Sequence, residues 1–243
     1  MKGSVLVTGG ARRIGLAICE ALSARGWRVL AHSRDPRNPL CEDFTQPGAA
    51  ERLFAAAVAL APDLCAVVNS AAVFSTAAEL PTVEAAAMRA VNVTAPVRLA
   101  ELLAAHLAAR RATGAVVNLL DTRILGVFQG GQDTQDSQGT QRGQLASRYN
   151  GRAFAAPYAA SKLDLARATV AQARSLAPTL RVNGVAPGPV LPPVDAANSE
   201  KGGPILLLRR PAPSDVAAAV EFLLEAEAVT GQILAVDSGQ SLL

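Results

Sequence analysis

The sequence has few of the residues that build metal sites and disulfides. It contains three cysteines and two histidines in 243 residues. Cys19, Cys41 and Cys65 are odd in number and show no CxxC spacing, so we expect reduced thiols in a cytoplasmic protein. Because His32 and His106 are the only histidines, a histidine-built metal site is not expected, and we predict no metal.

Charge of one sign and long apolar runs are also scarce. Lys and Arg number 23 against 20 Asp and Glu, and no basic run exceeds two residues, so nucleic acid is not an expected partner. The most apolar stretch, 53–74, is interrupted by a proline, an aspartate and an asparagine, so no membrane span is expected. A strand-like run begins at Ser4, which leaves no room for a signal peptide and predicts a cytoplasmic protein.

What the sequence does have is 50% hydrophobic residues and a mean hydropathy of +0.25, which exclude a disordered chain. Short β-branched runs recur at 5–8, 28–32, 64–69, 115–120, 180–185 and 232–236. Between them lie segments with helical periodicity, at 14–24, 49–60, 83–91, 96–111, 158–176 and 214–224. This alternation predicts one α/β domain over residues 1–243, a Rossmann fold with a doubly wound parallel sheet of about seven strands flanked by helices.

One segment interrupts the alternation. Glutamine recurs at every third position from Gln129 to Gln144, within an insertion at about 126–150. The residues between the glutamines are mostly Gly, Asp, Thr and Ser, which predicts a solvated low-complexity loop. A second interpretation is a lid over a pocket, because long loops in compact domains are often functional.

The first predicted strand runs directly into a glycine-rich turn and then a helix, with the sequence Thr8-Gly9-Gly10-Ala11-Arg12-Arg13-Ile14-Gly15. Glycine permits positive φ angles and a close approach of the backbone to a phosphate. The start of the following helix offers free N–H groups and a partial positive charge. The turn therefore predicts a nucleotide site, although a glycine-rich turn can also be only a turn.

Later motifs follow this turn in the order found in the short-chain dehydrogenase/reductase family, which the sequence resembles over nearly its whole length. The matching motifs are Asn69-Ser70-Ala71-Ala72, Asn92, Tyr158 with Ser161-Lys162, Arg181-Val182-Asn183, Pro187-Gly188-Pro189 and Val236-Asp237-Ser238-Gly239. The resemblance implies a nicotinamide-dependent oxidoreductase with a small-molecule substrate. It also implies a homotetramer or homodimer that pairs the helices at 96–111 and 158–176.

Two departures are similar to one branch of that family. Arg13 stands where the family usually has a glycine, and Asp121 stands where it usually has a serine. Both substitutions resemble pteridine reductases and dihydromonapterin reductases, so the resemblance implies a pterin substrate. The segment between Asp121 and Tyr158 is longer than the family's, which leaves the substrate class open.

The end of the second predicted strand favours NADPH over NADH. NADH-binding proteins of this architecture place a carboxylate there, whereas this chain has Ser33 and Arg34. With Arg12 or Arg13 of the turn, these residues suit a 2′-phosphate, and exposed charges without a ligand are the alternative. Asp35 is expected to face solvent in a turn. The residues expected to contact NADPH or NADP+, several of them through the resemblance alone, are Gly9, Arg12, Arg13, Ile14, Gly15, His32, Ser33, Arg34, Asp43, Phe44, Asn69, Ser70, Ala71, Tyr158, Lys162, Pro187, Gly188 and Val190.

Tyr158 and Lys162 lie four residues apart on a predicted helix and therefore share one face. A nearby ammonium and the positively charged oxidised nicotinamide both favour the phenolate, so we expect them to lower the pKa of Tyr158 from its ordinary value near 10. Lys162 is also expected to hold the nicotinamide ribose. The alternative is a half-buried tyrosine and an unrelated surface lysine. Asn92 joins the predicted catalytic set by resemblance.

Asp121 is the most discriminating of the predicted catalytic residues. A serine hydroxyl there would donate to a ketone oxygen, whereas an ionised carboxylate can only accept. An aspartate suits a substrate with N–H groups or a ring nitrogen that needs a proton, and a pterin has both. A capping or turn aspartate is the alternative.

The sequence thus predicts an NADPH-dependent reductase of a pterin, with protons supplied through Tyr158 and Asp121. A carbonyl reductase, such as a 3-oxoacyl-thioester reductase, is one alternative. A catalytically silent NADP-binding regulator is the other.

Overall fold

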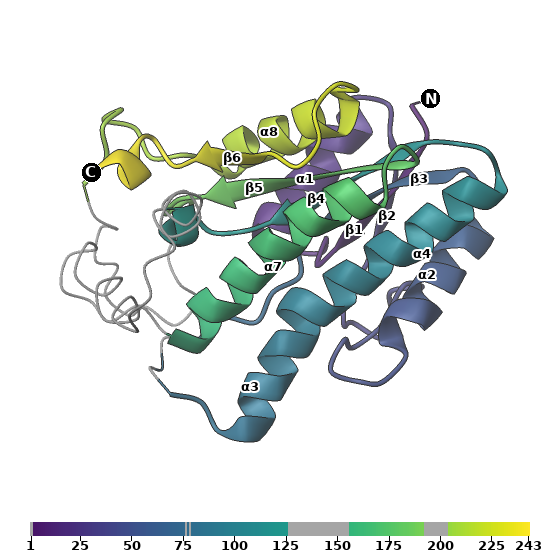
Figure 1. The fold of residues 1–243 in the computed structure, drawn as a ribbon, viewed down its shortest axis with the longest axis horizontal. Coiled ribbons are helices and arrows are strands. Elements are labelled where there is room, and N and C mark those ends of the chain that lie inside the picture. The colour runs from purple at the N-terminus through teal and green to yellow at the C-terminus, as the bar shows by residue number, and fades with distance from the viewer. Residues whose placement is uncertain (1, 76, 78, 126–155, 192–203) are drawn as a thin grey trace.

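The computed structural model describes residues 2–75, 77, 79–125, 156–191 and 204–243 (Figure 1). The glutamine-repeat insertion predicted at about 126–150 lies outside these residues. Its assignment as a loop or a lid therefore stays a prediction.

The described residues form one sheet of six strands in the order β2-β1-β3-β4-β5-β6. The strands are β1 (Ser4–Thr8), β2 (Arg28–Ala31), β3 (Leu64–Asn69), β4 (Gly114–Leu119), β5 (Leu180–Pro187) and β6 (Ile233–Val236). Every neighbouring pair is parallel. The chain winds outward in both directions from β1 and β3, which confirms the predicted doubly wound α/β fold.

The prediction of about seven strands is corrected to six among the described residues. Between β2 and Asp43, where every residue is described, the structure has no further strand, only one parallel bridge between Ser33 and Cys41. Pro36 and Pro39 lie between these two residues. Proline has no N–H to donate to a strand ladder, so this segment turns instead of pairing further.

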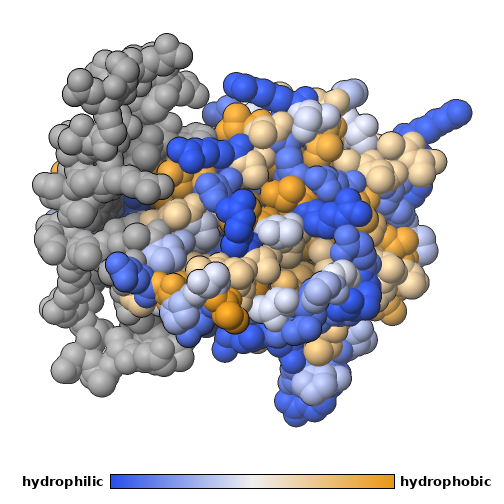
Figure 2. Space-filling model, turned by 60° about the horizontal axis from the view of Figure 1, so that its bottom comes forward, coloured by the Kyte–Doolittle hydropathy of each residue, from blue (hydrophilic) through white to orange (hydrophobic). Residues whose placement is uncertain are grey.

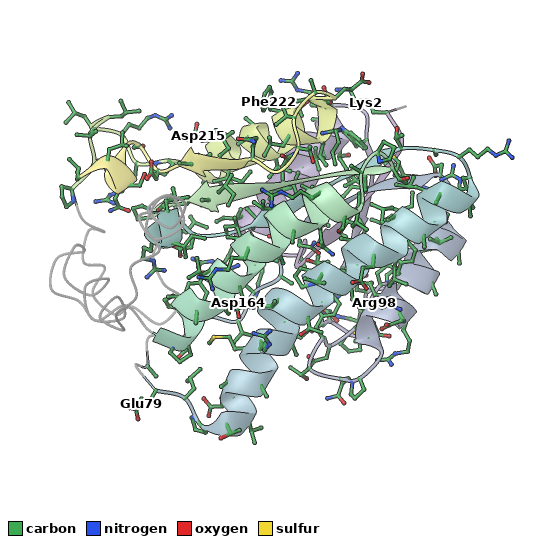
Figure 3. All side chains as sticks on the ribbon, in the orientation of Figure 1. Lys2, Glu79, Arg98, Asp164, Asp215 and Phe222 are labelled. Atoms are coloured by element: carbon green, nitrogen blue, oxygen red, sulfur yellow. The ribbon has the colours of Figure 1, made fainter. Side chains whose placement is uncertain are left out.

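Helices cover both faces of the sheet (Figure 1). One face carries α1 (Arg13–Ala24) and α8 (Pro213–Glu225), and the other carries α2 (Ala49–Leu60), α4 (Ala95–Ala109) and α7 (Ala156–Ser175). Figure 3 shows Lys2 and Phe222 on the α8 side, and Arg98 and Asp164 on the side of α4 and α7.

Two cores separate the sheet from these helix layers, because successive strand residues point to opposite faces. The α2–α4–α7 core takes Leu6, Val67, Val116 and Val182, all fully buried. The α1–α8 core takes Val5, Val68, Val117 and Val185, also fully buried. Burial on both faces explains why the strands are apolar without alternation, and it makes the sheet a rigid support for its carboxyl edge.

The helices predicted at 83–91 and 96–111 are joined. α3 (Thr82–Arg89) continues through a π-helical turn, Ala90–Thr94, into α4. Such turns inside helices often occur at functional sites, and this one holds Asn92.

On the surface, Figure 2 shows polar and apolar side chains interspersed over the side that it presents. Within the part of the chain that the structure describes, no helix is long and apolar enough to cross a membrane.

Candidate active site

The carboxyl ends of the parallel strands meet at one edge of the sheet, and the predicted site residues gather there. Gly9 follows β1, Asn69 ends β3, Asp121 follows β4 and Gly188 follows β5. β1 and β3 are neighbours in the sheet, although β2 lies between them in the sequence. Ligands of open α/β sheets bind where the winding changes direction in this way.

The turn between β1 and α1 requires its glycines. Gly9 has a φ of +66°, and a Cβ on Gly15 would lie 2.2 Å from the Gly9 carbonyl oxygen. Arg12 is the N-cap of α1, where no described side chain caps the helix and the first turn contains no acidic residue. The first N–H groups of α1 therefore face an anion-binding position, which fits the diphosphate of a nucleotide.

The end of β3 is tied to this turn. Thr8 Oγ1 accepts hydrogen bonds from the backbone N–H groups of Ser70 and Ala71, at 3.0 and 3.1 Å. Both predicted cofactor contacts thus lie beside the β1–α1 turn. The Asn69 amide instead donates to Asn118 Oδ1 at 2.8 Å, so this side chain links β3 to β4.

His32 connects the turn to the segment that carries Asp43 and Phe44. Its Nδ1 accepts from the Gly9 N–H at 3.2 Å, so Nε2 carries the hydrogen and donates to the Glu42 carbonyl at 3.0 Å. Burial lowers the pKa of His32, which favours this neutral form. The Phe44 ring packs 4.8 Å from the His32 ring, centroid to centroid, and both side chains are buried. They form a buried support beside the β1–α1 turn, and Asp43 is their more exposed neighbour.

The segment after β2 forms the predicted Asp35-Pro36 turn. Ser33 Oγ accepts from Asp35 N–H and from the Asn38 amide, both at 3.2 Å. Arg37 donates to both carboxylate oxygens of Asp35, at 3.0 and 2.6 Å, and lowers its pKa. The Asp35 charge is therefore offset by Arg37, and Arg34 stays exposed.

Arg12 and Arg13 are exposed at the start of α1, in the turn that carries the predicted phosphate site. Arg13 has a φ of +54°, a left-handed conformation that glycine adopts more easily. This explains why the family resemblance places a glycine at that position. Ile14, by contrast, packs its half-buried side chain against the α1–α8 core.

The loop after β5 is held against the end of β6. Gly188 N–H donates to the Val236 carbonyl at 3.0 Å, and a Cβ on Gly188 would lie 2.7 Å from the Asp237 Cβ. Val190 N–H donates to the Gly188 carbonyl at 2.8 Å. Pro187, Gly188 and Val190 thus lie at the same edge of the sheet as the turn.

The structure brings Tyr158, Lys162 and Asp121 together at the end of β4. The Tyr158 hydroxyl lies 3.4 Å from Asp121 Oδ2, and Lys162 Nζ donates to the Leu119 carbonyl at 2.7 Å. All three residues are buried, with 8%, 3% and 9% of the residue exposed for Tyr158, Lys162 and Asp121. A phenol, an ammonium and a carboxylate in one buried site can hold and transfer a proton.

Among the protein's own groups, the expected lowering of the Tyr158 pKa is not found. Burial, and then the negative charge of Asp121, raise the pKa of Tyr158. Lys162 is directed to the Leu119 carbonyl, with its Nζ 5.9 Å from the centre of the tyrosine ring. Burial also lowers the pKa of Lys162 to about 8. Tyr158 is therefore protonated at neutral pH, as a proton donor must be.

Asn92 is linked to Tyr158 through Ser161. Its side chain accepts from the Val73 N–H at 2.8 Å and donates to the Val73 carbonyl at 2.9 Å. It also donates to Ser161 Oγ at 3.0 Å, and Ser161 Oγ donates to the Tyr158 carbonyl at 2.7 Å. Asn92 thus fixes the loop after β3 relative to the helix that carries Tyr158.

Two residues of the site were missed by the sequence analysis. Arg123 donates to both oxygens of Asp121, and its guanidinium carbon lies 5.6 Å from the Tyr158 ring centre and 5.7 Å from that of Phe74. The Phe74 and Tyr158 rings meet edge to face at 4.8 Å. The Asp-x-Arg spacing was the available signal for Arg123, because Asp35 and Arg37 form the same contact.

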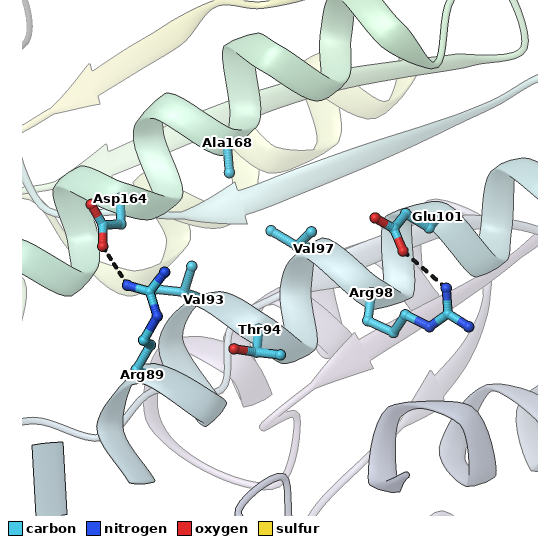
Figure 4. A pocket seen from close by; sticks show the side chains of 8 residues that line it. All are labelled: Arg89, Val93, Thr94, Val97, Arg98, Glu101, Asp164 and Ala168. Carbon is cyan, nitrogen blue, oxygen red and sulfur yellow. Dashed lines mark hydrogen bonds and ion pairs between the residues drawn. The ribbon is translucent and has the colours of Figure 1, made fainter. Parts of the chain in front are cut away.

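A groove of about 520 Å³ lies elsewhere, between α4 and α7 (Figure 4). Val93, Val97 and Ala168 line it, and an ion pair of 2.6 Å between Arg89 and Asp164 crosses it. None of its lining residues belongs to the predicted site. Among the described residues, no group of His, Cys, Asp and Glu side chains could hold a metal ion.

Known proteins agree with this arrangement. Residues 3–120 match the family described as short chain dehydrogenase, and residues 144–241 match the one described as Enoyl-(Acyl carrier protein) reductase. The short-chain dehydrogenase/reductase homolog YusR of Bacillus subtilis (strain 168) is 44% identical over 90 residues, which cover 35% of this chain and 70% of that protein.

Two solved structures are similar over nearly the whole chain. One is FolM alternative dihydrofolate reductase 1 from Brucella suis in complex with NADP, with 29% identity, a TM-score of 0.76, and coverage of 99% of this chain and 96% of that chain. The other is a candidate betaketoacyl-ACP reductase, with 25% identity, a TM-score of 0.74, and coverage of 99% and 98%. With its strand-end site and these similarities, the chain belongs to the short-chain dehydrogenase/reductase family of oxidoreductases.

Proposed function

We propose that this protein is an NADPH-dependent reductase whose substrate is a pterin. The observation that carries the proposal is Asp121, a buried carboxylate beside the Tyr158 hydroxyl at 3.4 Å. It stands where the family usually has a serine. The similarity to the Brucella suis protein, an alternative dihydrofolate reductase bound to NADP, supports the same cofactor and substrate class.

The cofactor site of this chain fits NADPH. The uncapped start of α1 suits the diphosphate, and Arg12, Arg13 and Arg34 suit the 2′-phosphate. Ser70, Ala71 and Gly188 line the same strand ends. Lys162 would hold the nicotinamide ribose. When bound, NADPH supplies the hydride.

Tyr158 acts as the proton donor in this proposal. Burial and Asp121 both raise its pKa, so the hydroxyl keeps its proton until the substrate accepts it. Lys162, with a pKa lowered to about 8, stays mostly charged at neutral pH and favours the phenolate that results.

Asp121 selects the substrate. Its oxygens accept hydrogen bonds from Arg123 and face Tyr158, so in this arrangement it is an acceptor. An acceptor attracts an N–H group of a pterin and repels the oxygen of a ketone as negative charge develops on it. Of the predicted proton routes, this geometry supports Tyr158 directly, and Asp121 serves to orient the ring.

A carbonyl reductase is the second candidate. The similarity to a candidate betaketoacyl-ACP reductase favours it, because Tyr158 could also protonate a carbonyl oxygen. Tyr158 and Lys162 in one buried site count against a catalytically silent NADP-binding regulator.

NADPH oxidation tests these alternatives. Dihydrobiopterin, dihydromonapterin and dihydrofolate are compared with an acetoacetyl thioester and simple ketones. We expect kcat/KM for one pterin to exceed that for every ketone by about a hundredfold, the usual worth of one catalytic hydrogen bond. Faster reduction of a ketone would establish the carbonyl reductase instead, and no turnover of any substrate would favour the regulator.

A further inference from the structure

Arg123 holds the Asp121 carboxylate through three hydrogen bonds. Asp121 Oδ1 accepts from the Arg123 backbone N–H at 3.0 Å and from Nε at 2.9 Å. Asp121 Oδ2 accepts from the terminal guanidinium nitrogen at 2.7 Å. A carboxylate has about four acceptor positions, so Arg123 fills most of them.

The remaining position lies on Oδ2 and faces Tyr158. The hydroxyl is 3.4 Å away, longer than the ordinary O–H···O range of about 2.5–3.0 Å. This weak contact leaves room for a donor from the substrate. It also leaves the Tyr158 proton available for transfer.

Aromatic rings fix the guanidinium in place. Its carbon lies 5.7 Å from the Phe74 ring centre and 5.6 Å from the Tyr158 ring centre, within the reach of about 6 Å for a cation–π contact. The Arg123 side chain is 34% exposed and that of Asp121 is 12% exposed, so water reaches the arginine more easily than the carboxylate. Lys162 is a further charged group whose pKa the negative charge of Asp121 raises.

We propose that Arg123 is a positioning residue that sets substrate specificity, because it leaves Asp121 a single acceptor position beside the Tyr158 hydroxyl. The site then selects a flat ring that offers one N–H close to the atom that takes the proton. A group with two parallel N–H donors, such as an amidine, cannot bind Asp121 while Arg123 fills the other acceptor positions of the carboxylate. This inference rests on the proposed function and identifies a single ring N–H as the group that Asp121 recognises.

The activity test compares the unmutated protein with Arg123→Met and Arg123→Lys. Arg123→Met should lower kcat for the pterin by about tenfold to a hundredfold, because Asp121 is no longer oriented. Guanidinium at tens of millimolar, far below the molar range that unfolds proteins, should restore part of this loss. It should restore nothing in the unmutated protein or in the double variant Asp121→Asn/Arg123→Met.

A binding test works without turnover. Benzamidine offers two parallel N–H groups that match a free carboxylate. In calorimetry with NADP+ present, Arg123→Met should bind benzamidine at least tenfold more tightly than the unmutated protein, about 1.4 kcal/mol. Arg123→Lys should change in the same direction by less, because an ammonium cannot fill the positions of a planar fork. It serves the same test if Arg123→Met does not fold.

Arg52→Met is the matched control. Arg52 donates through Nε and a terminal nitrogen to both carboxylate oxygens of Glu42, at 2.9 and 2.8 Å, in the same forked arrangement on the surface. This variant should keep the unmutated kcat, KM and benzamidine affinity, because exposed ion pairs contribute little to stability.

Three results would overturn the assignment of Arg123: unchanged kcat and KM in Arg123→Met, no gain in benzamidine affinity, or no rescue by guanidinium. A folded, unmutated protein that reduces no pterin would instead defeat the proposed function. The benzamidine comparison would still decide whether Arg123 limits the acceptor positions of Asp121.

Discussion

Tyr158 and Lys162 lie on one face of α7, and burial shifts their pKa values in opposite directions. It raises the pKa of Tyr158 and lowers that of Lys162, because a low-polarity environment disfavours the charged form of each group. Asp121 raises both values, since its negative charge opposes a phenolate and stabilises an ammonium. Compared with the same groups in water, Tyr158 therefore holds its proton more firmly and Lys162 holds its proton less firmly.

The identity of residue 121 should decide which substrate is reduced. We expect Asp121→Ser to lower pterin turnover by about a hundredfold, because the acceptor for the ring N–H is lost. Reduction of an activated ketone should improve or stay unchanged, since a hydroxyl can donate to the developing oxyanion. NADPH oxidation with both substrates measures this, and NADPH affinity should hardly change.

Tyr158→Phe is the control for that substitution. It should disable both reactions, because it removes their shared proton donor. Pterin turnover that survives in Asp121→Ser would show that the aspartate is only a capping residue. It does cap the turn at Thr122–Ile124, where its side chain accepts from the Arg123 N–H.

The Lys162 pKa also makes folding stability depend on pH. Lys162 titrates near 8 in the folded protein and near 10.5 in the unfolded chain, so between these values the unfolded chain binds more protons and stability rises with pH. The cost of burying the ammonium, on the order of 3 kcal/mol, is fully present below pH 8. In urea unfolding without cofactor, the unmutated protein should gain stability relative to Lys162→Met from pH 8 to 10.5.

Other groups also titrate at alkaline pH, but they are present in both proteins. The chain has three lysines, and Lys2→Met, which removes an exposed lysine, is the matched control. Burial raises the pKa of Cys19 to about 11 and also raises the pKa values of Cys65 and Tyr158, which lowers stability at high pH in both proteins. Parallel pH curves for the unmutated protein and Lys162→Met would contradict the burial of a titrating ammonium.

At the level of elements, the β1–α1 turn and the segment after β2 together form the expected 2′-phosphate site. NADPH should bind at least tenfold more tightly than NADH, about 1.4 kcal/mol. Arg34→Ala should remove most of this preference, because a charge-assisted contact is lost. Fluorescence titration with both cofactors measures it, with Arg25→Ala as a control, since Arg25 is exposed at the far end of α1. Equal affinities in the unmutated protein would refute the site.

Most elements could be predicted because their patterns are local. The strands begin and end within two residues of their expected limits, since continuous apolar runs between helical segments have few alternatives. In the described segment between β2 and Asp43 the seventh strand does not form, because Pro36 and Pro39 cannot donate to a strand ladder there. The break expected between 91 and 96 is a π turn, because proline is tolerated in the first turn of α4.

The site was predictable only where motifs carry it. Tyr158, Lys162 and Asp121 follow from spacing and resemblance, and the structure brings them together. Arg123 and Phe74 belong to none of the family motifs in this chain, and their roles arise from contacts between the turn after β4, the loop after β3 and α7. Such contacts join segments that are distant in the sequence, so no local hydrophobic periodicity indicates them.

For the whole molecule, α4 and α7 present the groove of Figure 4 on the side opposite α1 and α8. Its charged residues are paired within the chain: Arg89 with Asp164 at 2.6 Å, and Arg98 with Glu101 at 2.9 Å. The half-buried Val97 and Ala168 line the groove between these pairs. A surface with its charges already neutralised and small apolar residues between them costs little to desolvate.

We therefore expect a homodimer or homotetramer in which α4 and α7 pack against the same helices of a second copy, as the family resemblance implies. A two-fold interface is self-complementary, so one bulky charge there would be introduced twice at the contact. Val97→Arg should shift sedimentation toward the monomer at micromolar concentration. Ala55→Arg, on the exposed side of α2, should leave the assembly unchanged. A monomer for the unmutated protein at every concentration would show that this face stays in contact with solvent.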